Sequence, residues 1–199
     1  MPEKSKILSQ ASLLFMQYGI KSISMDDLAR ELGISKKTIY QHFESKTALV
    51  NAAFKAHLKQ MEEIVLEFLD KKELNAIEQI LGLAEMHQNL LSQMKPTVLF
   101  DIQKYYKDSW NLVEEHKENF VKKIIENNLT KGIEEGLYRP ELNAKVLSIF
   151  YRNQITALTD SKQFSINKYE LPDIHKAFIN FYIHGIASDK GRSFLTNHN

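Results

Sequence analysis

Apolar side chains recur at three- and four-residue spacings along almost the whole chain, which is the pattern of amphipathic α-helices. Only seven glycines and four prolines interrupt this pattern. It predicts long helices over residues 2–18, 46–69, 75–94, 109–135, 141–159 and 172–188, with a shorter one over 96–107. A polar loop is expected over residues 160–171, and the tail from residue 189 onward is expected to fray. The sequence therefore predicts an all-α fold.

Residues 24–43 differ from the rest, because they predict two short helices joined by a tight turn. Ser24 and Asp27 have the spacing of a capping box at the start of the first helix. Gly33 lies where that helix must end, since glycine adopts the left-handed conformation readily. Ser35 then fits the N-cap of the second helix. This is the layout of a helix-turn-helix, whose second helix enters the major groove of DNA.

The second short helix carries lysines at the end where the helix dipole disfavours them. Lys36 and Lys37 lie in its first turn, and a phosphate group in front of that turn would remove the unfavourable interaction. Ile39 and Phe43 are four residues apart and are predicted to face inward, which leaves the polar side chains outward. Alone, such a face would be read as merely solvated; within this motif it predicts DNA contact. Lys46 begins the next helix and likewise suits a phosphate.

This stretch resembles the DNA-binding domain of the TetR family of bacterial transcriptional repressors over roughly residues 5–50. The residues that match the family pattern are Ser24, Leu28, Ala29, Gly33, Ile34, Ser35, Tyr40, Phe43, Ser45, Lys46 and Leu49. One departure is Lys37, where members of the family often carry a small residue. The resemblance implies a DNA-binding domain over residues 1–47 and a helical effector-binding and dimerisation domain over residues 48–199. The predicted DNA-binding residues are Ser24, Lys36, Lys37, Thr38, Tyr40, Gln41, His42 and Lys46.

Composition adds limits to this interpretation. The 199 residues are enough for one sizeable core, and the net charge of +1 alone would not suggest a nucleic-acid partner. No apolar run approaches the roughly 18 residues of a membrane span, and the first residues do not form a secretory signal. The absence of cysteine excludes disulfides and thiolate metal sites, and it suits a cytoplasmic location.

Catalytic or metal-binding constellations are not visible in the sequence. None of the seven histidines has an acidic residue three positions before it, as a di-iron helical bundle would need. No two histidines are four residues apart, and no glycine-rich phosphate loop appears. We therefore expect a protein that is not an enzyme and that has neither a metal nor a cofactor.

The middle helices contain methionine, aromatic and histidine residues that suit either a core or a ligand pocket. For any one of them plain core is the simpler interpretation, and His87 could equally be a hydrogen-bonded core or surface histidine. The family resemblance implies that the middle helices enclose an effector pocket. The candidates for its wall are Met86, His87, Leu90, Met94, Phe100, Tyr105, Trp110 and Phe120.

The last two long helices carry aromatics on more than one side, which predicts a second buried face. In the family these helices form a four-helix dimer interface with their copies, although they could instead complete the monomer core. The candidate interface residues are Tyr151, Ile155, Phe178, Phe181 and Tyr182.

Together these features predict a homodimeric, ligand-responsive regulator, most simply a repressor released from a palindromic double-stranded DNA operator by a small-molecule inducer. An activator or an effector-independent DNA binder is the alternative within the same class. A helical enzyme or partner-binding bundle without DNA binding is the alternative from another class. The sequence identifies neither the effector nor the operator and its spacing, nor the regulated genes.

Overall fold

The computed structural model describes residues 2–71, 73–158 and 170–197, which are helical throughout apart from short connections, with no β-strand in those ranges. The chain forms two compact units, each described by itself. Unit 1 contains Met1–Glu63 and Gln93–Glu115, and unit 2 contains Ile64–Ser92 and His116–Asn199. No helix in the described ranges is long and apolar enough to span a membrane. The predicted all-α fold is confirmed.

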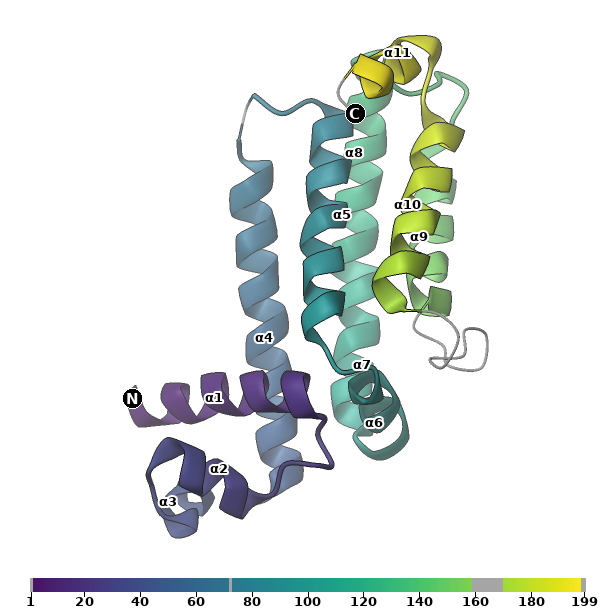
Figure 1. Ribbon diagram of the computed structural model, residues 1–199. Helices are drawn as coiled ribbons and strands as arrows, with labels where there is room; N and C mark the ends of the chain where they lie inside the picture. The colour runs from purple at the N-terminus through teal and green to yellow at the C-terminus, as the bar shows by residue number, and fades with distance from the viewer. Residues whose placement is uncertain (1, 72, 159–169, 198–199) are drawn as a thin grey trace. The chain divides into compact units, whose positions relative to one another are not determined.

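Unit 1 begins with three helices that precede the long α4 (Figure 1). Their bounds are α1 Pro2–Tyr18, α2 Met25–Leu32 and α3 Lys36–His42, and α4 extends over Lys46–Leu69. Later in the chain come α6 (Thr97–Tyr105) and α7 (Lys107–His116). The core of unit 1 is drawn from all of these except α7, with Phe15, Leu28, Ile39, Leu49 and Ile102 essentially inaccessible to solvent.

Unit 2 combines α5 (Ala76–Gln93) with the helices from α8 (Lys122–Glu134) to the end of the chain. After α8 come α9 (Ala144–Leu158), α10 (Leu171–Ile186) and α11 (Asp189–Asn197) (Figure 1). Helix α9 contacts both α8 and α10. Tyr138, which follows α8, is fully buried, and its hydroxyl donates to the carbonyl oxygen of Ala76 on α5 at 3.0 Å and lies 3.1 Å from Asn128 Oδ1 on α8. Burial raises the pKa of this hydroxyl, so Tyr138 stays a neutral donor.

The helix predicted over residues 109–135 contains a feature that periodicity did not reveal. Its first part is α7, its last part is α8, and between them Lys117–Val121 form a π-helical turn. Such a turn inserts an extra residue and shifts the side chains that follow it around the helix axis. The prediction of one regular helix over residues 109–135 is therefore wrong at Lys117–Val121.

The expectation that the tail frays is also wrong. Residues 189–197 form α11, and Leu195 is 5% exposed. The tail is held by Ser188, whose backbone N–H donates to Leu137 O and whose hydroxyl donates to Gly136 O. These partners lie about fifty residues earlier in the chain, so no local signal marks them. Most of the loop predicted over residues 160–171 lies outside the described residues.

The predicted domain boundary between residues 47 and 48 stays a prediction. The two compact units divide the chain between Glu63 and Ile64, within α4.

Candidate DNA-binding site

Helix α2 begins with the predicted capping box. The Ser24 hydroxyl oxygen accepts from the Asp27 backbone N–H at 3.1 Å, and the Ser24 backbone N–H donates to Asp27 Oδ2 at 2.9 Å. The hydrogen bonds from Ser24 lower the pKa of the exposed Asp27 carboxyl to about 2. Gly33 ends the helix with φ of +66°, in the left-handed region. The predicted capping box of Ser24 with Asp27 and the predicted helix end at Gly33 are confirmed.

Helix α3 is seven residues long and is fixed at both ends. The Ser35 hydroxyl accepts from the Thr38 backbone N–H at 3.0 Å, and the two hydroxyl groups are 2.8 Å apart. Ile39 is inaccessible to solvent and Phe43 is 5% exposed, so both face the interior as predicted. With its inner face and its cap fixed, α3 presents its other side chains in defined directions.

The outer face of α3 carries Lys36, Lys37, Tyr40 and Gln41, all exposed. Lys36 Nζ donates to Asp26 Oδ2 at 2.8 Å, and this hydrogen bond raises the pKa of the lysine. The pair is exposed, so it contributes little to stability and leaves the ammonium group accessible. Tyr40 keeps 43% of its surface accessible. This face suits hydrogen bonds and charge contacts with a DNA groove.

The other predicted DNA-binding residues are engaged within the protein. The hydroxyl groups of Ser24 and Thr38 belong to the two caps. His42 is half-buried, and its Nε2 lies 3.4 Å from Glu3 Oε2. Lys46 Nζ donates to Ile20 O at 2.6 Å, and partial burial lowers its pKa. An ammonium group has three N–H donors, so this hydrogen bond leaves Lys46 capable of a phosphate contact.

Sequence reasoning missed two residues beside α3. Asp26 holds Lys36, although ten residues separate them. The Lys4 ammonium group lies 5.4 Å from the centre of the Phe43 ring, which brings the start of α1 next to the end of α3. A lysine near the N-terminus gives no local sign of this position, which only the packing of α1 creates.

Helix α6 is tied to the helix-turn-helix inside unit 1. Asp101 on α6 is 5% exposed, and its carboxylate accepts from the Lys21 backbone N–H at 3.2 Å. The Lys95 backbone N–H donates to Met16 O at 2.8 Å. The Lys21 ammonium group also lies 4.2 Å from the centre of the Tyr105 ring. A displacement of α6 would therefore act directly on the segment between α1 and α2.

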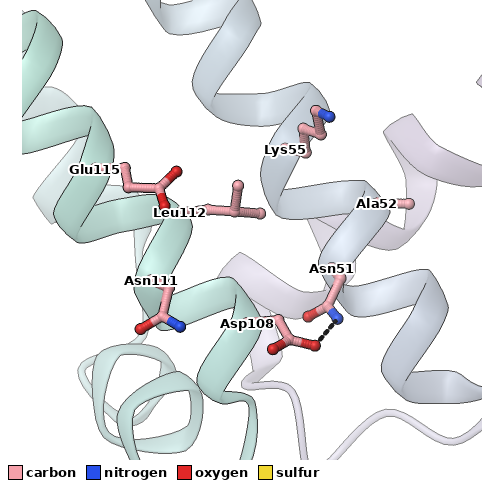
Figure 2. A pocket seen from close by; sticks show the side chains of 7 residues that line it. All are labelled: Asn51, Ala52, Lys55, Asp108, Asn111, Leu112 and Glu115. Carbon is pink, nitrogen blue, oxygen red and sulfur yellow. Dashed lines mark hydrogen bonds between the residues drawn. The ribbon is translucent and has the colours of Figure 1, made fainter.

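A pocket of about 360 Å³ opens between α4 and α7 in unit 1 (Figure 2). Asn51 Nδ2 donates to Asp108 Oδ2 at 3.3 Å, and the buried Ser109 hydroxyl donates to Asn51 Oδ1. These hydrogen bonds connect α4 with α7, and they already engage the side-chain amide of Asn51, one of the polar groups that line the pocket. None of the residues predicted to line an effector pocket is found here. The lining residues are Asn51, Ala52, Lys55, Asp108, Asn111, Leu112 and Glu115.

The predicted effector-pocket residues are divided between the units. In unit 2, Met86, His87 and Leu90 are half-buried on α5. In unit 1, Phe100 and Tyr105 are both 44% exposed, and their rings contact each other edge to face. They therefore lie on the surface of this unit. Of the remaining candidates, Met94 is buried, whereas Trp110 and Phe120 are half-buried.

The predicted dimer residues also differ in position. Tyr151, Ile155 and Tyr182 are less than a tenth exposed and belong to the core of unit 2. Phe178 is half-buried against the rings of Tyr151 and Tyr182. Phe181 is 78% exposed. Other exposed apolar side chains on α9 are Val146, Ile149 and Phe150.

The described residues contain no candidate metal site. No three histidine, cysteine, aspartate or glutamate side chains there come together in a way that could hold a metal ion.

Comparison with known proteins gives a consistent result. The family model described as "Bacterial regulatory proteins, tetR family" matches residues 7–53. An uncharacterised HTH-type transcriptional regulator of Bacillus subtilis, YvaF, is 23% identical over 186 residues, which cover 93% of this chain and 96% of the relative. The HTH-type transcriptional repressor KstR2 of Mycobacterium tuberculosis is 22% identical over 157 residues, covering 75% of this chain and 76% of the relative.

A solved structure with a similar fold is that of a transcriptional regulator from Saccharomonospora viridis in complex with choline. Its TM-score is 0.71 at 19% identity, and the alignment covers 94% of this chain and 98% of the other. The likeness extends through both units, whereas the family model covers only the first three helices and the start of α4. The relatives are transcriptional regulators, and the capped helix-turn-helix with its exposed α3 is the part that the family model matches. Residues 7–53 thus form a DNA-binding domain of the tetR family, within a chain that is similar to an HTH-type transcriptional regulator over 93% of its length.

Proposed function

We propose that this protein is a homodimeric repressor that leaves a palindromic operator when a small-molecule effector binds to its C-terminal helices. The observation that carries DNA binding is the outer face of α3, where Lys36, Lys37, Tyr40 and Gln41 are exposed on a helix with a buried inner face. The relative KstR2 is named as a repressor, which supports repression here. The choline complex supports response to a small molecule, without indicating which one. A cytoplasmic location is part of the proposal.

Within this proposal Lys37 and Gln41 contact base edges, whereas Lys36, Tyr40 and Lys46 contact phosphates. Lysine and glutamine side chains suit the hydrogen-bonding groups of the major groove. Phosphate contacts fix the position of the protein and make binding strongly dependent on salt. The hydroxyl groups of the two caps hold α2 and α3 in place for these contacts.

Two copies of the chain are needed to read a palindrome, and α9 and α10 supply the proposed dimer surface. Phe181 and Phe150 are 78% and 58% exposed, and Ile149 is 47% exposed. Large apolar side chains at this exposure would gain from burial against a second copy. A C2 dimer sets two α3 helices at a fixed separation, as half-sites one helical turn or more apart require.

The proposed effector response uses the covalent connections between the units. Helix α5 of unit 2 leads directly into α6, and α6 holds the α1–α2 segment through Asp101 and Lys21. An effector that favours a different position of α5 would shift α6 and thereby the helix-turn-helix. Such a response is a shift between two states, and its size is set by the difference in effector affinity.

The decisive experiment selects the fragments of genomic DNA that the purified protein binds, and then tests which compounds release them. A shared palindrome and a compound that lowers affinity for it are expected. Transcription from a promoter carrying that palindrome should fall when the protein is present and recover with the compound. Binding without any inverted repeat contradicts the dimeric arrangement, and increased transcription identifies an activator.

A further inference from the structure

Two histidines meet in the interior of unit 2. The rings of His87 on α5 and His175 on α10 are 4.5 Å apart between centroids and pack edge to face at 76°. His175 is 1% exposed, and among the described residues its buried Nε2 has no hydrogen-bond partner. Tyr182, seven residues further along α10, is 8% exposed, and its buried hydroxyl also has no hydrogen-bond partner among the described residues. Positions seven apart share a helix face, so both unpaired groups lie on one side of α10.

A buried lysine adds positive charge to this region. Lys117 lies in the π-helical turn and is 6% exposed, although lysine is rarely buried in proteins. Its Nζ is 3.4 Å from Thr156 Oγ1 on α9, and its charge contributes to the lowered pKa of His87. Glu118, the neighbouring carboxylate, forms ion pairs with Lys122 and Arg152. A π-helical turn often occurs at a functional site, and here it carries the buried lysine.

Aromatic rings lie next to these polar groups. The Tyr151 ring is 5.2 Å from Phe178 and 5.0 Å from Tyr182 between centroids. On α5, the half-buried Met86 directly precedes His87, and the half-buried Leu90 follows it by three residues. Burial lowers the pKa of His87 to about 3, yet the side chain keeps part of its surface accessible.

We infer that His87, Lys117, His175 and Tyr182, here called the His–Lys cluster, bind the acidic head group of an effector that has an apolar body. This inference rests on the proposed function, since it names the chemical class of that effector. His175 Nε2 and the Tyr182 hydroxyl, the two buried groups that are otherwise unpaired, are the neutral donors that this face of α10 offers to a carboxylate. The positive charge of Lys117 favours an anion and opposes a cation. Tyr151 and Phe178 would contact the apolar body.

Matched probes test the head group. Octanoate, octanol and octylamine share one body, and phenylbutyrate, phenylbutanol and phenylbutylamine share another. Isothermal titration calorimetry with the full-length protein should give, for at least one body, an acid that binds about tenfold or more tighter than its alcohol, the effect of a charge-assisted hydrogen bond. The amine should bind more weakly than the alcohol. If no acid binds better than its alcohol, or if an amine binds best, the inference is overturned.

Three substitutions test the residues. Lys117→Met keeps an unbranched apolar chain and should weaken acid binding about tenfold, while alcohol binding stays within about twofold. Tyr182→Phe removes only a hydroxyl and should weaken the acid about threefold. Lys123→Met is the matched control, because it removes an exposed lysine near by and should leave both ligands unaffected. If Lys117→Met does not fold, Tyr182→Phe and the probes still decide.

The DNA measurement is kept separate from these titrations. Acid binding with the expected variant pattern but without operator release would support the His–Lys cluster and contradict the proposed regulation. Operator release by the amine or the alcohol, with the acid inactive, would support regulation and overturn the cluster as an acid site. Equal acid affinity in the wild type, Lys117→Met and Tyr182→Phe would also overturn it.

Discussion

The helix-turn-helix of unit 1 and the core of unit 2 are stabilised over different distances in the sequence. The caps of α2 and α3 join residues three positions apart, Ser24 with Asp27 and Ser35 with Thr38. In unit 2, the Tyr138 hydroxyl contacts a carbonyl oxygen 62 residues away. The first kind of contact can be read from a short stretch of sequence, whereas the second exists only once the helices have packed.

The difference has a functional side. In unit 1 the buried residues fix a short helix, and its exposed residues are proposed to perform the binding. In unit 2 the proposed binding groups, such as His175 and Lys117, are themselves buried. Substitutions should therefore separate stability from function easily in the first region and with difficulty in the second.

The largest expected effect comes from placing a charge inside unit 2. Ile155→Glu should lower the free energy of unfolding by about 3–5 kcal/mol, because an unpaired charge would replace a side chain that is 7% exposed. Phe181→Glu should leave the chain folded, because Phe181 is 78% exposed, and should weaken the proposed dimer. Urea unfolding followed by circular dichroism and sedimentation equilibrium measure the two effects.

Phe181→Leu is the control, since it keeps an apolar side chain at the same position. It should remain as dimeric as the wild type. A Phe181→Glu protein that is still fully dimeric would place the dimer surface elsewhere.

Two glycines provide a second comparison. A Cβ at Gly132 would overlap the ring of Tyr138, so Gly132→Ala should lower the free energy of unfolding by about 2–3 kcal/mol. The gain of about 1 kcal/mol in helix propensity does not offset this loss. Gly33→Ala should cost about 1–2 kcal/mol, because only its φ of +66° resists a side chain.

Gly136→Ala is the control within unit 2. Its φ is +70° and nothing lies within 4 Å of the added Cβ, so its cost should match that of Gly33→Ala. Thermal unfolding of the three variants at one protein concentration decides the matter. A Gly132→Ala protein as stable as Gly136→Ala would contradict the close packing on Tyr138.

These comparisons explain which predictions the sequence supported. The Ser24–Asp27 box and the Gly33 turn were predicted correctly, because each depends on residues that are neighbours in the chain. Helix α11 was missed, because its contacts come from Gly136 and Leu137. The ion pair of Lys36 with Asp26 was missed for the same reason, on a smaller scale.

The sequence predicted less about the candidate sites in unit 2. Ile155 and Phe181 have the same apolar character in the sequence, yet one is buried and the other exposed. His87 could be singled out as a polar residue in an apolar stretch, but its contact with His175 spans two helices. The π-helical turn that carries Lys117 leaves no mark in the apolar spacing.

Acid should distinguish the two regions as well. Burial lowers the pKa of His87 to about 3 and that of His175 to about 4, so both rings are neutral in the folded protein at pH 7. As the pH falls below about 6.5, the unfolded chain takes up protons that the folded chain does not, and stability decreases until the folded rings are protonated near pH 4 and 3. The loss between pH 7 and pH 4 should be on the order of 3 kcal/mol from His175, with a smaller addition from the partly exposed His87.

The measurement is urea unfolding at a series of pH values. A His87→Leu, His175→Leu double variant should lose most of this dependence, whereas His184→Leu, which alters an exposed histidine, should retain it. The capping carboxylate of Asp27 responds in a lower pH range. Its lowered pKa keeps its contribution to stability intact until the pH falls below about 4. Equal acid sensitivity of the double variant and the wild type would contradict buried, neutral histidines.

The smallest expected effects concern DNA and divide the lysines and glutamine of unit 1 into two groups. Gln41→Ala and Lys37→Ala should each cost about 1–2 kcal/mol at one operator position and relax sequence preference there. Lys46→Met should weaken operator and random DNA equally and reduce the slope of log affinity against log salt by about 1. Fluorescence anisotropy over a salt series, with single-base operator variants, measures both. Lys46 Nζ already donates a hydrogen bond of 2.6 Å to Ile20 O in the absence of DNA. If Lys46→Met leaves the salt slope unchanged and lowers the melting temperature, the role of this lysine is to stabilise the fold through that hydrogen bond and not to contact a phosphate.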